Sequence, residues 1–338
     1  MNIINCAVVG AGRISQKHID AILSKKDGFN LVAICDSDEE VAKTAAEKLE
    51  IPHYSSLEQM LSEGPAMDLV SLCTPSGLHA AQAIAALRAG KHVVTEKPMA
   101  CNLLDAEQMI QVAQACDKKL FVVKQNRLNP TVQALKQAID DRLFGNIHMV
   151  QSNVFWTRPQ AYYDQAPWRG TWAMDGGAFM NQASHYVDLL EWLVGPIVKI
   201  QSMTKTFARN IEAEDSGVLN LEWKNGAIGS MSVTMLAYPN NLEGSITILG
   251  SKGSVKIGGM ALNQVEFSHF EGANDIFDKA ISYKTECVYG NGHEPYYQNV
   301  ADVLLRGANP IADGCSGIKS IKILSQIYKE KIMPNTMT

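Results

Sequence analysis

The sequence lacks the features that mark several classes of protein. Its 338 residues carry a formal net charge of −5, so no excess of basic residues indicates a nucleic-acid-binding surface. No apolar run reaches the roughly 18 residues that a membrane-spanning helix needs. Residues 1–5 contain no basic segment and lead directly into a predicted strand, so we expect no signal peptide. These absences favour a cytoplasmic globular protein with neither a nucleic acid nor a membrane as its partner.

Cysteine patterns typical of metal sites are also missing. The seven cysteines form no Cys-x-x-Cys motif and no His/Cys cluster at metal-ligand spacing. Cys6, Cys35 and Cys73 lie within or at the ends of apolar runs, as buried free thiols do in a reducing compartment. We therefore predict no metal site.

The first part of the chain alternates short apolar runs with helical stretches. The predicted strands are residues 3–9, 31–35, 68–73, 92–95 and 120–123. The predicted helices between them are residues 13–24, 38–49, 79–89 and 103–116. Continuous apolar strands separated by helices predict a parallel sheet that is covered on both faces. Residues 1–125 therefore read as a Rossmann domain with a doubly wound parallel sheet, in a protein of the α/β class.

The pattern changes after about residue 126, where longer and alternating strands begin. Met231, Val233 and Met235 point to one side of such a strand, and the polar residues between them point to the other. This alternation predicts a C-terminal α+β domain, residues 126–338, with a mostly antiparallel open sheet. Its predicted helices are residues 177–194, 295–305 and 318–331, and the last is free to pack back on the first domain. We expect this domain to bind substrate, and its open sheet face is either an oligomer interface or plain solvent-exposed surface.

A glycine turn between the first strand and the first helix predicts a nucleotide site. In Gly10-Ala11-Gly12-Arg13-Ile14-Ser15, the first glycine permits a tight turn and the second lets backbone N–H groups approach a pyrophosphate. Asp36 ends the second strand 24 residues after Gly12. A carboxylate there accepts hydrogen bonds from ribose hydroxyls and repels a 2′-phosphate, which favours NAD over NADP. Arg13 can stack on adenine or meet a phosphate, and Asp36 as a solvated turn residue remains the alternative.

Residues after the next strands border the same sheet edge. Thr74 and Pro75 end one strand and His79 follows, so all three are predicted to contact the dinucleotide. The alternative for His79 is an ordinary residue of a first helical turn. Glu96-Lys97-Pro98 closes the strand 92–95. Lys97 is a candidate for proton transfer, because the positive nicotinamide and desolvation both lower the pKa of a nearby ammonium. A salt bridge to Glu96 or a bond to a helix carbonyl is its structural alternative.

A second candidate cluster lies in the block of residues 175–188, where two glycines open a predicted helix. Asn181, His185 and Asp188 follow at spacings of four and three, which places an amide, an imidazole and a carboxylate on one helical face. The carboxylate could orient the imidazole. A helical histidine is often only a structural residue, but this polar stripe favours a catalytic role for His185.

Cations and aromatic residues concentrate in a third region. Its cations are Lys124, Arg127, Arg158 and Arg169. Forked guanidinium groups suit a carboxylate or phosphate substrate, and surface arginines on a strand edge are the alternative. Tyr289 lies in a glycine-flanked loop that reads as a pocket wall.

Together the glycine turn, Glu96-Lys97-Pro98 and the block 175–188 resemble the glucose–fructose oxidoreductase / inositol dehydrogenase (Gfo/Idh/MocA-type) family. The resemblance covers essentially the whole chain. It implies a Rossmann domain followed by a mostly antiparallel domain, in dimers or tetramers packed through the open sheet faces. It also implies that Lys97 and His185 share proton transfer.

Four further runs resemble a subgroup of that family: residues 124–127, 156–159, 168–172 and 181–185. Many family members have an aspartate where this chain has Asn181, and this subgroup has asparagine. The resemblance implies NAD-dependent oxidation of the C3 hydroxyl of UDP-N-acetyl-2-amino-2-deoxyglucuronate, a step toward bacterial surface polysaccharides such as O-antigen. Some members pass the hydride on to 2-oxoglutarate, and the residues of this chain do not decide whether it does so too. The alternatives are an NAD-dependent dehydrogenase of a free sugar or polyol, and a nicotinamide-binding sensor without turnover.

The predicted site residues fall into three groups. The predicted catalytic residues are Lys97 and His185. The predicted cofactor contacts are Gly10, Gly12, Arg13, Ile14, Asp36, Thr74, Pro75, His79, Glu96, Lys97, Gln125, Trp168 and Arg169. The predicted substrate contacts are Lys97, Arg127, Arg158, Tyr163, Asn181, His185 and Tyr289.

Overall fold

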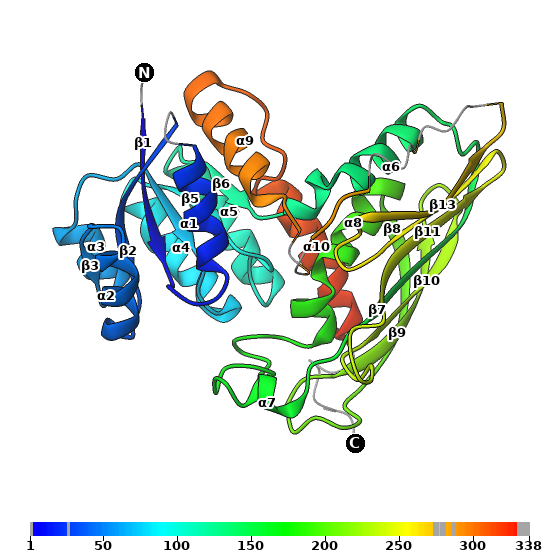
Figure 1. Ribbon diagram of the computed structural model, residues 1–338, viewed down its shortest axis with the longest axis horizontal. Coiled ribbons are helices and arrows are strands. Elements are labelled where there is room, and N and C mark those ends of the chain that lie inside the picture. The colour runs from blue at the N-terminus through cyan, green and yellow to red at the C-terminus, as the bar shows by residue number, and fades with distance from the viewer. Residues whose placement is uncertain are drawn as a thin grey trace. The chain divides into compact units, whose positions relative to one another are not determined.

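The computed structural model describes residues 3–25, 28–272, 277, 282–285, 288 and 290–329. Contacts along the chain divide it into two units (Figure 1). Unit 1 is Met1–Lys124 with His293–Ile321, and unit 2 is Gln125–Gly292 with Lys322–Thr338. We predicted a division after residue 125 with the C-terminal helix free to pack back on the first domain, and the contacts assign His293–Ile321 to unit 1.

Unit 1 is built on a six-stranded sheet in which every neighbouring pair is parallel. The strands lie in the order β3 (His53–Tyr54), β2 (Phe29–Cys35), β1 (Ile4–Val9), β4 (Leu69–Leu72), β5 (His92–Thr95) and β6 (Leu120–Val122). The direction of winding reverses between β1 and β4. In open α/β sheets, ligands bind outside the carboxyl ends of the strands at such a reversal. The predicted Rossmann sheet is confirmed.

The helices of unit 1 follow the predicted alternation. They are α1 (Ser15–Ser24), α2 (Glu39–Glu47), α3 (Leu57–Glu63), the 3₁₀ turn η1 (Ser76–Leu78), α4 (His79–Arg88), α5 (Leu103–Ala115) and α9 (His293–Arg306). α10 (Gly314–Ile327) begins in this unit. Side chains of Asp38, Ser56 and Asn102 cap α2, α3 and α5 by accepting backbone N–H bonds in the first turn. β3 and α3 were not predicted, because two and seven residues are too short to show a hydrophobic period.

Unit 2 is built on a seven-stranded sheet that is antiparallel except at one pair. Its order is β13 (Gln264–Phe270), β12 (Gly253–Gly258), β11 (Glu243–Gly250), β7 (Ile147–Phe155), β10 (Ile228–Thr234), β9 (Ser216–Trp223) and β8 (Ile197–Lys205). β7 and β10 pair in parallel, and every other neighbouring pair is antiparallel. The predicted mostly antiparallel sheet is confirmed.

The two faces of this sheet differ as the alternation predicts. Met231 and Val233 are buried, whereas Ile228 on the same strand is 54% exposed. The buried face packs against α8 (Ser184–Val194), where the Trp223 indole N–H lies 3.4 Å from the Leu190 carbonyl oxygen. The other helical segments of unit 2 are η2 (Gln125–Leu128), α6 (Pro130–Asp140), α7 (Gln160–Tyr163) and the π-helix η3 (Ala178–Gln182). Figure 1 shows α6 and α8 on the same side of the sheet.

Candidate active site

The glycine turn has the geometry that a bound pyrophosphate requires. Gly10 follows β1 with φ +89°, and a Cβ there would lie 2.8 Å from both the carbonyl carbon and the oxygen of Cys73. Any side chain at Gly10 would therefore strain the turn and collide with the chain after β4. A Cβ at Gly12, by contrast, would meet nothing within 4 Å. The turn is open on that side, at the N-terminus of α1, where helix N–H groups favour an anion.

Asp36 is tied to this turn. Its Oδ2 accepts the backbone N–H of Ala11 at 2.7 Å, and its Oδ1 accepts that of Asp38 at 3.0 Å. A carboxylate has about four acceptor sites, so the hydrogen-bonding capacity for ribose hydroxyls is retained. Arg13 is exposed and Ile14 is half-buried beside the turn. The residues present fit a dinucleotide.

His79 connects two loops at the carboxyl edge of the sheet. The ring is 1% exposed, with Nδ1 2.8 Å from the Pro98 carbonyl oxygen and Nε2 2.9 Å from that of Thr74. Burial lowers the pKa of His79. The Thr74 hydroxyl donates to Gln82 Oε1. His79 thus joins the loops after β4 and β5, a structural role that the sequence analysis did not foresee, and its contact with the cofactor stays a prediction.

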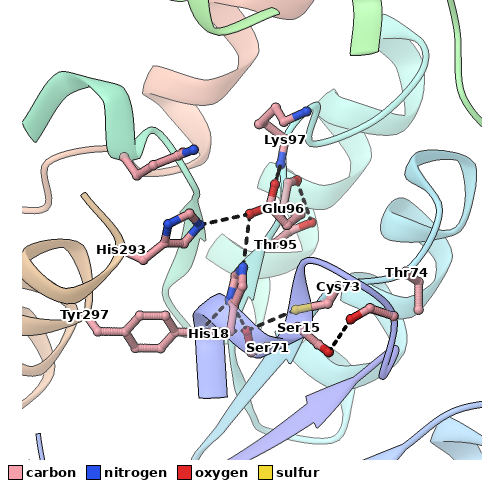
Figure 2. Close-up of polar contacts among 12 residues, drawn as sticks. Ser15, His18, Ser71, Cys73, Thr74, Thr95, Glu96, Lys97, His293 and Tyr297 are labelled. Carbon is pink, nitrogen blue, oxygen red and sulfur yellow. Dashed lines mark hydrogen bonds and ion pairs between the residues drawn. The ribbon is translucent and has the colours of Figure 1, made fainter. Parts of the chain in front are cut away.

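Glu96 occupies the centre of a buried polar network that Figure 2 shows. Its Oε1 lies 3.0 Å from Nε2 of His18, and its Oε2 accepts the backbone N–H of Lys97 at 3.1 Å. Burial alone would raise the pKa of the Glu96 carboxyl, but the hydrogen bond from His18 holds it well below its ordinary value. The carboxylate is therefore ionised, and Lys97 follows it half-buried at the end of β5.

In unit 2 the structure corrects the predicted continuous helix over residues 177–194. A π-helix covers Ala178–Gln182, and α8 begins only at Ser184. The Ala183 N–H donates to the Ala178 carbonyl five residues back, which adds a residue to that turn. At the start of the segment, the buried Glu214 carboxylate accepts the Phe179 N–H at 3.0 Å.

The break separates Asn181 on the π-helix from His185 and Asp188, which remain three residues apart on α8. The Asn181 amide nitrogen donates to Asp175 Oδ1. Nε2 of His185 lies 3.2 Å from the Gln125 amide nitrogen, which fits a neutral imidazole accepting from that amide. Oδ1 and Oδ2 of Asp188 accept from Arg127 at 2.7 and 2.8 Å, so the orienting carboxylate expected for His185 is engaged with an arginine.

The environment of Arg127 therefore differs from that of an arginine exposed at a substrate site. Its side chain and that of Asp188 are each 3% exposed, and the guanidinium carbon lies 5.3 Å from the Trp192 ring. Substrate binding by Arg127 stays a prediction. Lys124 is likewise buried, and its ammonium donates to the Ser320 hydroxyl at 2.8 Å.

Of the four predicted cations, Arg158 and Arg169 form a cationic cluster around one aromatic ring. Their guanidinium carbons lie 5.4 and 4.4 Å from the ring centroid of Tyr162. Arg158 Nε donates to Gln182 Oε1 at 3.0 Å, and Gln182 in turn donates to the Tyr162 hydroxyl at 3.1 Å. Arg169 Nε is buried without a hydrogen-bond partner among the described residues. Two guanidinium groups stacked on one aromatic ring concentrate positive charge, and such a cluster suits an anion.

The remaining predicted contacts vary in accessibility. Trp168 is half-buried, with the Arg169 guanidinium carbon 4.6 Å from its ring. Tyr163 is 7% exposed, and burial raises the pKa of its hydroxyl. Oε1 of Gln125 is a buried acceptor that no described residue satisfies, as expected beside a ligand that donates hydrogen bonds. Tyr289 lies outside the described residues.

Comparison with known proteins assigns the family. Residues 4–124 match the family described as "Oxidoreductase family, NAD-binding Rossmann fold", and residues 132–256 match the "GFO/IDH/MocA C-terminal domain". The chain belongs to the GFO/IDH/MocA oxidoreductase family. The predicted family, the enzyme class and the NAD cofactor are confirmed.

Two solved structures resemble the chain over almost its whole length. The WlbA dehydrogenase from Bordetella pertussis, in complex with NADH and UDP-GlcNAcA, is 51% identical with a TM-score of 0.94 and covers 97% of this chain and 95% of its own. The WlbA dehydrogenase from Chromobacterium violaceum, with the same two ligands, is 47% identical with a TM-score of 0.93 and covers 100% and 98%. Among curated relatives, myo-inositol 2-dehydrogenase from Thermotoga maritima is 27% identical over 73% of each chain.

His18 and Tyr297, which lie beside Glu96 (Figure 2), were not predicted from the sequence. His18 lies on α1 next to the buried Ile19, Ala21 and Ile22, so a polar residue on the core face of that helix was the available signal. Tyr297 comes from α9, more than 270 positions later, and no local pattern joins the two.

In the described part of the chain no helix is both long and apolar enough to cross a bilayer.

Proposed function

We propose that this protein oxidises the C3 hydroxyl of UDP-N-acetyl-2-amino-2-deoxyglucuronate to a ketone, with NAD as the hydride acceptor. The observation that carries the proposal is the likeness to the Bordetella pertussis WlbA dehydrogenase, at 51% identity across 97% of this chain. That enzyme's structure holds NADH and UDP-GlcNAcA, the same sugar nucleotide. The cationic cluster in unit 2 supports an acidic substrate independently of that likeness.

The cofactor is held at the glycine turn. The backbone from Gly10 to Ile14 receives the pyrophosphate, Asp36 receives the ribose hydroxyls, and Arg13 lies beside the adenine. NAD, when bound, supplies the acceptor for the hydride. The further proposed contacts are Thr74, Pro75, His79, Glu96, Lys97, Gln125, Trp168 and Arg169.

Lys97 and His185 handle the hydroxyl proton. Oxidation of a carbinol releases a proton with the hydride, so a group of suitable basicity must take it. His185 is the second candidate base, and because a neutral imidazole has one acceptor nitrogen, the Gln125 amide must release Nε2 before that atom takes the proton. Since two such groups titrate together, their pH dependence belongs to the pair rather than to either residue. Comparison of Lys97→Met, His185→Asn and the double variant tests whether both serve one step, because their effects would then not add.

Arg158 and Arg169 bind the anionic parts of the substrate. The sugar nucleotide carries a carboxylate and a diphosphate, and arginine binds both through paired N–H groups. Arg158 is half-buried against Trp156 and Tyr162, which reduces the solvent screening of its charge. The further proposed substrate contacts are Lys97, Arg127, Tyr163, Asn181, His185 and Tyr289.

The proposal extends to partners. The exposed apolar residues Met149, Met203, Val218 and Ile228 line the open face of the unit 2 sheet, and they support a homotetramer or dimer packed through that face. A ketone product would feed transamination in the synthesis of bacterial surface polysaccharides, in the cytoplasm. 2-Oxoglutarate as a second hydride acceptor is tested together with the reaction.

A product assay tests the function. Purified protein is incubated with NAD and UDP-GlcNAcA, with and without 2-oxoglutarate, and the sugar nucleotide is analysed by mass spectrometry and NMR. We expect loss of two hydrogens and a ketone at C3. A product that accumulates beyond the amount of NAD only when 2-oxoglutarate is present would show recycling. An unchanged sugar nucleotide together with turnover of inositol or a free sugar would refute the proposal in favour of the polyol alternative.

Arg158→Met is the matched variant for the substrate class. We expect KM for UDP-GlcNAcA to rise by roughly 10- to 100-fold, the loss of one charge-assisted contact. UDP-GlcNAc, which lacks the carboxylate, is the control ligand, and its weaker binding should change much less. Equal losses for both ligands would assign Arg158 to the diphosphate or to folding instead of the carboxylate.

A further inference from the structure

The buried network around Glu96 is larger than the proposed chemistry requires. His18 Nδ1 lies 2.8 Å from the Tyr297 hydroxyl and 3.0 Å from that of Ser71, and these two hydroxyls are 2.7 Å apart. On the other side of the ring, Nε2 reaches Glu96 Oε1 at 3.0 Å. A continuous path of hydrogen bonds therefore runs from Tyr297 on α9 through His18 on α1 to Glu96 after β5 (Figure 2).

The network holds an ion pair in the core. His18 is 0% exposed and Glu96 5%. Burial alone lowers the pKa of His18, but the neighbouring Cys73 and the hydrogen bond to Glu96 raise it to about 10. At neutral pH the pair is imidazolium and carboxylate. A buried ion pair is seldom a net source of stability compared with apolar residues of the same volume, so it calls for another explanation.

A metal ion is the first alternative. His18, Glu96 and His293 each offer a ligand atom, all within 4.8 Å of one another. Both nitrogens of His18, however, already have hydrogen-bond partners in the protein, and the positive charge of Lys97 acts on Glu96. A cation would have to displace these bonds. His293 Nε2 is 3.7 Å from Glu96 Oε1, and burial lowers the pKa of His293, so this ring is neutral and adds no second charge.

The position of the carboxylate explains the network better. Glu96 Oε2 accepts the backbone N–H of Lys97, so a fixed carboxylate fixes the backbone that carries the lysine. The electrostatic interaction between the two is reciprocal: Lys97 favours ionised Glu96, and ionised Glu96 favours protonated Lys97. Both effects require the carboxylate to stay ionised and in place.

We propose that His18 is a positioning residue for Lys97. It holds Glu96 as a buried carboxylate against the Lys97 backbone, and Ser71 and Tyr297 fix the His18 ring from behind. His18 touches neither substrate nor cofactor in this role. The inference rests on the proposed function, because the role of Lys97 in proton transfer is itself part of that proposal.

The test is the pH profile of kcat/KM for the wild type, His18→Met and Glu96→Gln. Methionine removes the hydrogen bonds with little change of volume, and glutamine removes the charge at constant shape. We expect kcat to fall at least tenfold in both variants. The acidic limb of the profile should move to lower pH by about one unit, because loss of the nearby anion makes the Lys97 ammonium lose its proton more easily.

Three further variants separate positioning from folding. His18→Gln keeps a donor toward Glu96 and should recover part of kcat. Tyr297→Phe removes only the hydroxyl behind His18 and should move the limb in the same direction by a smaller amount. His92→Gln is the control, because His92 is the half-buried histidine at the other end of β5, and its profile should match the wild type.

Different failures have different meanings. If Lys97→Met retains wild-type turnover, the proposed role of Lys97 falls, and the positioning inference falls with it. If Lys97→Met is inactive while His18→Met and Tyr297→Phe keep the wild-type profile, only the inference is overturned. A loss of thermal stability in His18→Met without any shift of the limb also overturns it, as does a stoichiometric metal ion in the purified wild-type protein.

Discussion

Replacing each of the two glycines in the turn after β1 with alanine should affect a different property of the protein. Gly10→Ala places a Cβ 2.8 Å from the Cys73 carbonyl group and 2.9 Å from the Thr74 nitrogen, in a residue with φ +89°. Gly12→Ala places a Cβ in open space. The first change therefore acts on folding, and the second acts on whatever occupies that space.

The magnitudes follow from these distances. A non-glycine residue in the left-handed region costs about 1–2 kcal/mol. Moving the backbone after β4 to relieve the contact adds about 1–3 kcal/mol. For a unit of about 150 residues, a total of about 2–5 kcal/mol lowers Tm by roughly 5–15 °C. Gly12→Ala should change stability by less than about 1 kcal/mol, because alanine only restricts the unfolded chain there.

Thermal unfolding and titration with NADH, followed by fluorescence, separate the two effects. We expect Gly12→Ala to melt near the wild-type temperature and to bind NADH roughly 10- to 100-fold more weakly, because its methyl group keeps the pyrophosphate from the backbone. Gly10→Ala should melt earlier. If Gly12→Ala bound NADH with wild-type affinity, the pyrophosphate would lie elsewhere. If Gly10→Ala melted with the wild type, the local backbone would be freer than the structure indicates.

Two further predictions concern the buried ion pairs. Arg127→Met should lower the free energy of unfolding by about 3–5 kcal/mol, because it leaves Asp188 charged and buried. The double variant Arg127→Met/Asp188→Leu should recover part of that loss. An unchanged Tm with a higher KM would instead support substrate binding by Arg127. The second concerns His18, whose pKa is raised from 6.5 to about 10, so its contribution to stability is complete below pH 6.5 and disappears as the pH rises to about 10. Urea unfolding at pH 7 and pH 9 should therefore show wild-type stability falling by up to about 1.4 kcal/mol per pH unit relative to His18→Met, and parallel curves for the two proteins would contradict the charged state of His18.

The sequence predicted most of the fold because its signals are local. Apolar runs such as residues 92–95 and 120–123 fall on the observed β5 and β6. The alternation around Met231 correctly identified the covered face of the second sheet. Its main error is the continuous helix over residues 177–194, because the hydrophobic period does not distinguish a π-turn from an α-turn. Nor does it reveal that Glu214, more than 30 positions away, accepts the Phe179 N–H at the start of that segment.

The sequence predicts the position of candidate residues in the fold better than it predicts their hydrogen-bond partners. Lys97 and Asp36 lie at the carboxyl edge of the sheet, as their place after a strand requires. Asp188 was expected beside His185 because three residues separate them on a helix, yet its carboxylate binds Arg127 from η2. Spacing along one element predicts which side chains share a face, but a buried charge takes the partner that the tertiary fold supplies.

The same reasoning determines how the proposed chemistry must be tested. Glu96 and Asp188 carry buried charges next to residues of the proposed site, so removing either one disturbs folding and chemistry together. A fall in activity alone would therefore not distinguish a positioning residue from a damaged core. A shifted pH limb in His18→Met at unchanged NADH affinity would distinguish them, because a loosened core weakens binding and stability but does not move the proton equilibrium of one lysine in a predicted direction.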